Sequence, residues 1–160
     1  MNSMDKIIPI EIKELKQEHI PYLVEKLSQE NPEYLKHYTA FELTDEKFIS
    51  LLTKASKDKY FGIFFGDEIV GFYMLRGFDE GFEIPSYGVI ILSKFSNKGL
   101  SKLTLYHSFS LCRLNKVKKL MLKVRPENTF AKKLYESLGF QRTGFDEKNG
   151  NYIYHKTLMD

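Results

Sequence analysis

Hydrophobic positions recur along the chain with two different periods, and these predict a mixture of strands and helices. Apolar residues at every second position, or short apolar runs between turn residues, are typical of strands, whereas spacings of three and four are typical of helices. By these patterns we expect strands at residues 7–15, 60–65, 69–78, 83–92, 119–124, 140–145 and 152–158. We expect helices at residues 17–29, from 44 onward, at 99–116 and at 128–138.

Turn and cap residues support these boundaries. Gly66-Asp67-Glu68 joins two apolar runs as a hairpin, and Asn149-Gly150 predicts a type I′ turn in the last hairpin. Asn128 suits the N-cap of the last helix, and Gly139 suits its end. The order β-α-α-β-β-β-α-β-α-β-β predicts an α/β (α+β) fold with a mostly antiparallel central sheet, helices on its faces and one β-α-β crossover. We expect one domain over residues 1–160.

Composition narrows the class of protein. The 160 residues are 42% apolar and 28% charged, which is typical of a globular chain and excludes disorder for most of it. A single cysteine, Cys112, excludes an internal disulfide framework and is expected to be a small core residue. No apolar run approaches the ~20 residues of a membrane span, and the N-terminus lacks the basic and apolar parts of a secretory signal. We expect a soluble, cytoplasmic protein.

The histidines give no sign of a metal site. His19, His37, His107 and His155 are scattered and show no metal-ligand spacing, so no metal is expected. His107 suits a half-buried structural position in the long helix. His155 is either structural or part of the wall of an acceptor site.

Charge is uneven along the chain, although the net charge is only +3. Residues 94–133 hold 11 Lys and Arg against one acid, or +10. Residues 1–93 hold 10 basic and 16 acidic residues, or −6, and residues 134–160 hold 3 and 4, or −1. A basic stretch in an otherwise acidic chain indicates either a site for an anion, such as phosphate or nucleic acid, or a solvated helix face.

A buried strand that continues through a polar loop into a long helix is the segment best suited to anion binding. Val89–Leu92 is apolar, Ser93–Lys98 is polar, and Gly99 precedes the helix. Amides at a helix N-terminus lack intrahelical partners and bind diphosphates, and glycine lets the backbone approach closely. Lys98 and Lys102 add positive charge. The segment is neither a Walker loop nor a dinucleotide fingerprint, because Gly99 stands alone.

A later segment, from Asn128 to Phe140, completes a pattern that resembles the GCN5-related N-acetyltransferase (GNAT) family. That family's later helix reads Asn-x-x-Ala-x-x-Leu-Tyr-x-x-x-Gly-Phe, and the chain matches it at Asn128, Ala131, Leu134, Tyr135, Gly139 and Phe140. The family's phosphate motif, Gln/Arg-x-x-Gly-x-Gly/Ala, is matched at Gly99 and departs at Ser96 and Ser101. Because the family's phosphate contacts are mostly made by backbone, both departures are tolerable, but a side-chain contribution from Ser96 is in doubt.

The resemblance implies an acyl-coenzyme A cosubstrate, most often acetyl-CoA, and no metal. Its pantetheine would pair with backbone near Ile91 and Ser93, where the central strands splay, and its diphosphate would lie on Ser96–Lys102. The basic stretch would then face the phosphates of coenzyme A. The cofactor-binding residues implied are Ile91, Leu92, Ser93, Ser96, Asn97, Lys98, Gly99, Leu100, Ser101, Lys102, Asn128 and Ala131.

Transfer of an acetyl group to an amine needs a base and an acid. A primary ammonium group must lose a proton before its nitrogen attacks the thioester, and a thiolate leaves more easily when a phenol protonates it. The family places a tyrosine near the sulfur, so Tyr135 is the candidate acid, with a core tyrosine as the alternative. Glu83 is the candidate base, directly or through water, with an exposed edge carboxylate as the alternative and Asp79 and Glu80 as rivals. Asn128 either reaches the pantetheine or only caps its helix.

The acceptor is expected between residues 31–41 and the hairpin at residues 145–151. Tyr34, His37 and Tyr38 form an aromatic and polar cluster typical of small-molecule pockets, or they only pack an irregular loop. The negative charge of the N-terminal part favours a cationic acceptor such as a polyamine, an amino sugar or a peptide amine.

The favoured function is an N-acetyltransferase that works by direct attack in a ternary complex, as a monomer or homodimer, with neither nucleic acid nor membrane as partner. A non-catalytic acyl-CoA sensor of the same fold is the alternative, and Tyr135 argues against it because a binder needs no acid beside the sulfur. A nucleic-acid binder that uses residues 94–133 is less favoured, because the aromatic residues there lack base-stacking spacing.

Overall fold

The computed structural model describes residues 6–38 and 40–159, and seven strands form one sheet. The strands are β1 (Ile10–Glu14), β2 (Lys59–Phe65), β3 (Glu68–Arg76), β4 (Ser86–Ile91), β5 (Lys119–Val124), β6 (Gln141–Asp146) and β7 (Asn151–Thr157). Their order across the sheet is β1-β2-β3-β4-β5-β7-β6. All neighbours are antiparallel except β4 and β5, which are parallel. The predicted mixed, mostly antiparallel fold is confirmed.

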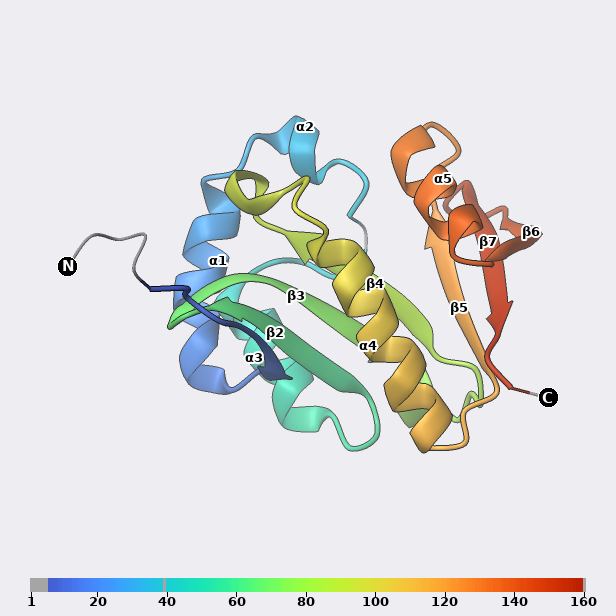
Figure 1. The fold of residues 1–160 in the computed structure, drawn as a ribbon, viewed down its shortest axis with the longest axis horizontal. Coiled ribbons are helices and arrows are strands. Elements are labelled where there is room, and N and C mark those ends of the chain that lie inside the picture. Colours follow the sequence, from blue (N-terminus) through green and yellow to red (C-terminus); the bar gives the residue numbers. More distant parts are fainter. Residues whose placement is uncertain (1–5, 39, 160) are drawn as a thin grey trace.

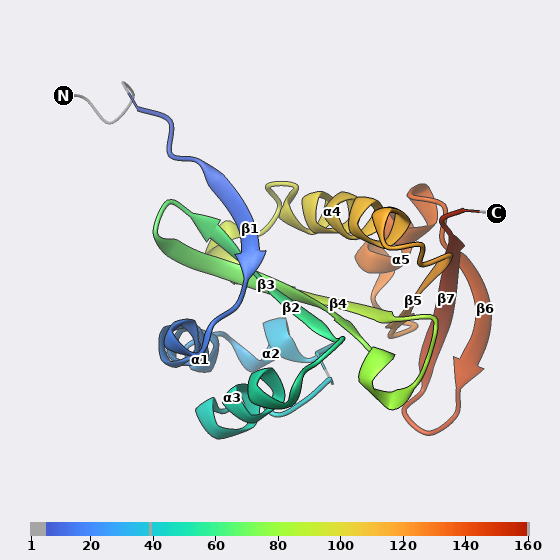
Figure 2. The same ribbon diagram turned by 90° about the horizontal axis from the view of Figure 1, so that it is seen from below.

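Helices cover both faces of this sheet (Figures 1 and 2). The α-helices are α1 (Ile20–Ser28), α2 (Pro32–Leu35), α3 (Asp45–Lys54), α4 (Leu100–Leu114) and α5 (Thr129–Ser137). Figure 2 shows α1, α2 and α3 on one side of the sheet and α4 and α5 on the other. The sequence patterns missed α2 and the short 3-10 helices η3 (Phe78–Glu80) and η4 (Ser93–Phe95), which are too short to show a period. Within the described residues, no helix has the length and apolar character needed to cross a bilayer.

Buried clusters form on both faces of the sheet because alternate residues of the central strands point to opposite faces. On one face, Leu23 of α1 and Phe48 of α3 pack with Phe72 of β3. On the other, Leu105 of α4 packs with Leu122 of β5. The middle of β3 is therefore buried on both sides, and the sheet holds the helices of both layers in place.

Two local expectations are wrong. The strand expected from residue 83 begins at Ser86, and Glu83 lies in the loop before it. Pro85, which has no amide proton for a ladder, precedes the strand. The last hairpin is closed by four residues rather than by a type I′ turn: the Gly150 amide donates to the Asp146 carbonyl at 2.7 Å, and Gly150 has a positive φ whereas Asn149 does not.

The parallel strands β4 and β5 pair only where β4 begins, opposite Met121 of β5. Ser86 is opposite Met121, and the Met121 amide donates to the Pro85 carbonyl at 3.0 Å. Beyond this point the two strands diverge toward α2 and α5, as Figure 1 shows. The predicted splay of the central strands is present, and it leaves backbone groups of β4 without a neighbouring strand.

Candidate active site

A cleft with a volume of about 1330 Å³ lies at this splay. Its wall is built by α2, β3, β4, β5, β7, the loops before β4 and α4, and α5. Most of the residues proposed from the sequence line it: Tyr34, His37, Tyr38, Glu83, Ile91, Ser96, Asn97, Gly99, Leu100, Ser101, Lys102, Asn128, Ala131 and Tyr135. Leu92, Ser93 and Lys98 do not line it.

At one end of the cleft, the N-terminus of α4 is uncapped. Gly99 is its N-cap residue with φ 82°, and no side chain caps the helix. A Cβ atom built on Gly99 would meet nothing within 4 Å, so the space before the first helical amides is open. Ser96 Oγ instead donates to the Ser93 carbonyl at 2.7 Å. Free amides, an open approach and Lys102 on the wall suit a diphosphate.

At the end of β4, side chains already form hydrogen bonds with the backbone of Ile91, which lines the cleft, and of Ser93, which follows the strand. The Leu92 amide donates to the Val70 carbonyl of β3, so by alternation Ile91 directs its backbone groups toward the splay. Tyr34 Oη donates to the Ile91 carbonyl at 2.5 Å, and Glu30 Oε1 accepts from the Ser93 amide at 3.1 Å. These are the two residues expected to pair with pantetheine.

Tyr135 lies on α5 and lines the cleft. Burial raises the pKa of its phenol to about 12, so the phenol keeps its proton at neutral pH. Its ring packs edge-on against Phe140 with centroids 5.8 Å apart, which makes it a partial core residue as well. Asn128 caps the same helix, because its Oδ1 accepts from the Ala131 amide at 3.2 Å.

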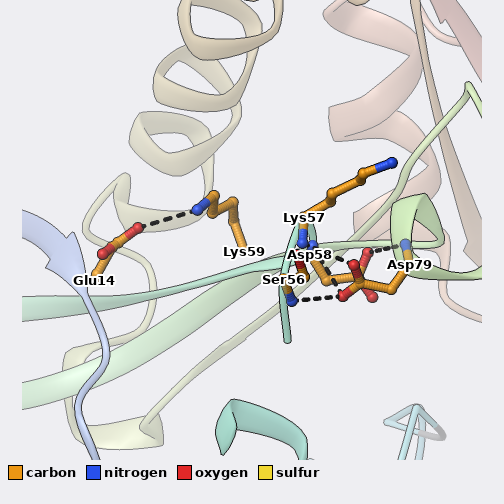
Figure 3. A network of polar contacts seen from close by, with 6 residues as sticks. All are labelled: Glu14, Ser56, Lys57, Asp58, Lys59 and Asp79. Atoms are coloured by element: carbon orange, nitrogen blue, oxygen red, sulfur yellow. Dashed lines mark hydrogen bonds and ion pairs between the residues drawn. The ribbon is translucent and has the colours of Figure 1, made fainter. Parts of the chain in front are cut away.

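Of the three candidate bases, Asp79, Glu80 and Glu83, the first lies outside the cleft. Asp79 accepts hydrogen bonds from the backbone amides of Ser56, Lys57 and Asp58 at 3.0, 2.7 and 3.2 Å, as Figure 3 shows. These bonds, with that of Lys57 the strongest, hold the pKa of Asp79 below its ordinary value. Asp79 therefore ties η3 to the chain before β2 and does not line the cleft, whereas Glu80 and Glu83 do.

The acceptor end is lined by His37 and Tyr38, as expected, and by Arg76 from the end of β3. Tyr38 also packs edge-on against Phe41 and Phe72, so it belongs to the core of that face. Arg76 Nη1 donates to the Ala40 carbonyl at 3.3 Å.

Three residues outside the main motifs are His155, His107 and Cys112. His155 lines the cleft and contacts Thr143 Oγ1 through Nδ1 at 2.6 Å, and burial lowers its pKa. His107 Nδ1 is hydrogen-bonded to Tyr73 Oη, and Cys112 is 2% exposed in the core. Both therefore have the structural positions expected. No group of three or more His, Cys, Asp or Glu is placed to hold a metal within residues 6–38 and 40–159.

Sequence reasoning missed several residues of this cleft. Asn151 lies in the hairpin at residues 145–151 that was expected to hold the acceptor, whereas Arg125, just after the predicted strand 119–124, was not singled out. The alternation of β5 and β7 places them on one face, but the pairing of these strands was needed to bring them together. Glu30 was also not singled out: it does not line the cleft, but its carboxylate accepts from the Ser93 amide just after β4.

The acetyltransferase (GNAT) family model matches residues 13–140. The chain belongs to this family. No curated protein matches the chain significantly. Many solved structures share the fold of this GNAT protein at low identity. The PaiA N-acetyltransferase of Thermoplasma acidophilum, solved with coenzyme A, has a TM-score of 0.76 at 17% identity over 94% of this chain and 99% of its own.

Two further GNAT neighbours are named for different acceptors. The Escherichia coli ribosomal-protein-S18-alanine N-acetyltransferase has a TM-score of 0.72 at 18% identity, covering 95% of this chain and 96% of its own. A spermidine N-acetyltransferase chimera from Vibrio cholerae and hSSAT has a TM-score of 0.76 at 16% identity, covering 93% and 95%. At such identities the likeness establishes the fold alone, and acetyltransferase activity follows from the family.

Proposed function

We propose that this GNAT protein transfers an acetyl group from acetyl-CoA to a primary amine by direct attack within a ternary complex. One observation carries the proposal: a single cleft joins an uncapped helix N-terminus, suited to a diphosphate, with the protonated phenol of Tyr135. A pure acyl-CoA sensor would use the first feature and has no need of the second.

The residues present fit coenzyme A. The amides of Ser96–Lys102 and the charge of Lys102 would hold the diphosphate. The Ile91 carbonyl and the Ser93 amide would pair with pantetheine in place of Tyr34 and Glu30. Asn128 and Ala131 line the same space from α5. The wider basic stretch, residues 94–133, favours the remaining phosphate.

Acetyl-CoA supplies an electrophilic thioester: a bond forms between the amine nitrogen and the carbonyl carbon, the carbon–sulfur bond breaks, and the ammonium group loses two protons. Glu83 is our candidate for taking the first, directly or through a water molecule, since it lines the cleft at the acceptor side. The second passes to the sulfur.

Tyr135 is suited to carry that second proton. A phenol with a pKa of about 12 does not simply give its proton to a thiolate whose pKa is ~8.5. It can, however, donate its proton to the sulfur while it accepts the proton leaving the nitrogen. Burial keeps Tyr135 protonated for this role, and Phe140 holds its ring.

Thiol release from acetyl-CoA with a panel of amines tests the proposal, with Tyr135→Phe as the variant. We expect turnover on at least one amine and a loss of kcat of at least about 10-fold in the variant, the range that a general acid provides. Coenzyme A affinity should stay unchanged. Thermal stabilisation by acetyl-CoA without turnover on any amine would favour the sensor, and no stabilisation would contradict both functions.

A further inference from the structure

Four buried polar atoms of residues that line the cleft have no hydrogen-bond partner in the described part of the chain: His37 Nδ1, Tyr38 Oη, Arg125 Nε and Asn151 Oδ1. The last two belong to Arg125 and Asn151, which are neighbours across the sheet. Asn151, at the start of β7, is 4% exposed, and its side-chain Oδ1 receives no donor from residues 6–38 and 40–159. Arg125 Nε, just after β5, is also buried; it makes no hydrogen bond within these residues, and its ion-pair partner Glu127 Oε1 lies 3.4 Å away. An unpaired buried polar atom costs about 1–3 kcal/mol, so such atoms in a cleft indicate a place where a ligand binds.

The strand pairing places these two residues side by side. The last pair between β5 and β7 is Val124 with Tyr152, so Arg125 and Asn151 occupy the next opposed positions. Since Val124 points into the core beneath α4, Arg125 and Asn151 point to the opposite face, on which α1 and α3 pack against β3. This is the acceptor side of the cleft.

The charged side chains around Arg125 and Asn151 already form ion pairs with one another. Glu127 Oε1 lies 3.4 Å from Arg125 Nε as an ion pair, and Arg125 Nη1 donates to the Asn149 carbonyl at 2.9 Å. On the same face, Lys123 Nζ is 2.7 Å from Asp146 Oδ2. The corner therefore offers a fixed donor beside a fixed acceptor with little net charge, which suits a neutral polar group better than a carboxylate or a second ammonium group.

We propose that the acceptor amine carries a carboxamide or peptide group and that Arg125 and Asn151 bind it. The amide carbonyl accepts from Arg125 Nε, and the amide N–H donates to Asn151 Oδ1. This inference rests on the proposed acetyl transfer and names its acceptor class: an amino-acid amide or a peptide amino terminus rather than a polyamine.

A matched pair of acceptors tests it. Alaninamide and alanine methyl ester both carry an α-amino group and a carbonyl, but only the amide has the N–H that Asn151 needs. With the wild-type protein we expect kcat/KM for the amide to exceed that for the ester by about tenfold, the effect of one buried hydrogen bond. Asn151→Leu should abolish this preference by lowering only the amide value. Arg125→Met should lower both values about tenfold.

Lys119→Gln is the control, because it removes a positive charge from the same face of β5 at its other end. It should leave both values unchanged, and thermal melting should show that all variants fold. Equal use of amide and ester by the wild type, or an equal loss with both in Asn151→Leu, would overturn the inference while the acetyl transfer stands.

Calorimetry separates the two proposals if no amine is acetylated. Alaninamide would be titrated into the wild-type protein and Asn151→Leu, each loaded with coenzyme A. Binding that is weakened about tenfold in the variant supports the amide site even without turnover, and the absence of binding to the wild type overturns it.

Discussion

The two ends of the cleft differ in what their backbone groups contact. At the phosphate end, α4 begins at Gly99 without a side-chain cap, and a Cβ there would meet nothing. At the splay, the Ile91 carbonyl and the Ser93 amide are held by Tyr34 and Glu30. The backbone amides at the phosphate end are free to bind a ligand, whereas the backbone groups at the splay are already hydrogen-bonded to side chains of the protein.

Because of this difference, we expect the diphosphate to contribute more than pantetheine to the binding free energy of coenzyme A. Contacts to the diphosphate replace hydrogen bonds to water alone, so no hydrogen bond within the protein is lost when they form. Contacts of pantetheine with β4 must replace existing hydrogen bonds, so they contribute only a difference. Release of Tyr34 and Glu30 would also free the α1–α2 connection, which links the occupation of the splay to the wall of the acceptor site.

The largest effect is expected from Gly99→Val. Its φ of 82° disfavours a β-branched residue, and the new side chain would lie over the free amides. We expect coenzyme A affinity, measured by calorimetry, to fall about 100-fold, since a blocked hydrogen bond to a charged group costs roughly 1.5–3 kcal/mol. Gly150→Val is the control: its φ is 74° and its Cβ also meets nothing, but it lies in the β6–β7 loop. Similar losses in both variants would show that strain alone, and not the phosphate end, is responsible.

A smaller effect of opposite sign is expected from Tyr34→Phe. Without the phenol, the Ile91 carbonyl has no partner until pantetheine binds, so the free protein should melt earlier and coenzyme A should bind about three to ten times more tightly. Tyr22→Phe, which removes a phenol that donates to exposed Glu68, should change neither quantity. Weaker binding in Tyr34→Phe would mean that its hydroxyl contacts the cofactor, and the comparison of the two ends would fail.

The smallest effect concerns Asp79, which ties η3 to the chain before β2. Backbone amides lower the pKa of Asp79, so it stabilises the fold above the ~3.9 of an unfolded aspartate, and this contribution is lost as pH falls through the lower folded value. Asp79→Asn should reduce stability at pH 7 and flatten its decline in acid, as measured by urea unfolding from pH 2.5 to 7. Asp67→Asn, in the exposed β2–β3 turn, should leave the profile unchanged.

Sequence patterns predicted those parts of the site whose geometry is local. Gly99 and the helix after it lie within one segment, and Asn128 caps the helix on which Tyr135 lies. Two local boundaries were nevertheless predicted wrongly. Glu83 was expected in a strand that begins only after Pro85, and four residues close the hairpin where two were expected.

The sequence by itself determined the order of the strands and helices, the uncapped helix end and the Tyr135 motif, because period, caps and glycine conformations depend on residues a few positions apart. Tertiary structure alone decided that Tyr34 and Glu30 occupy the splay, and that Arg125 and Asn151 share a corner. Those contacts join residues far apart in sequence. They exist only because the sheet has one strand order and register, which the packing of both layers selects.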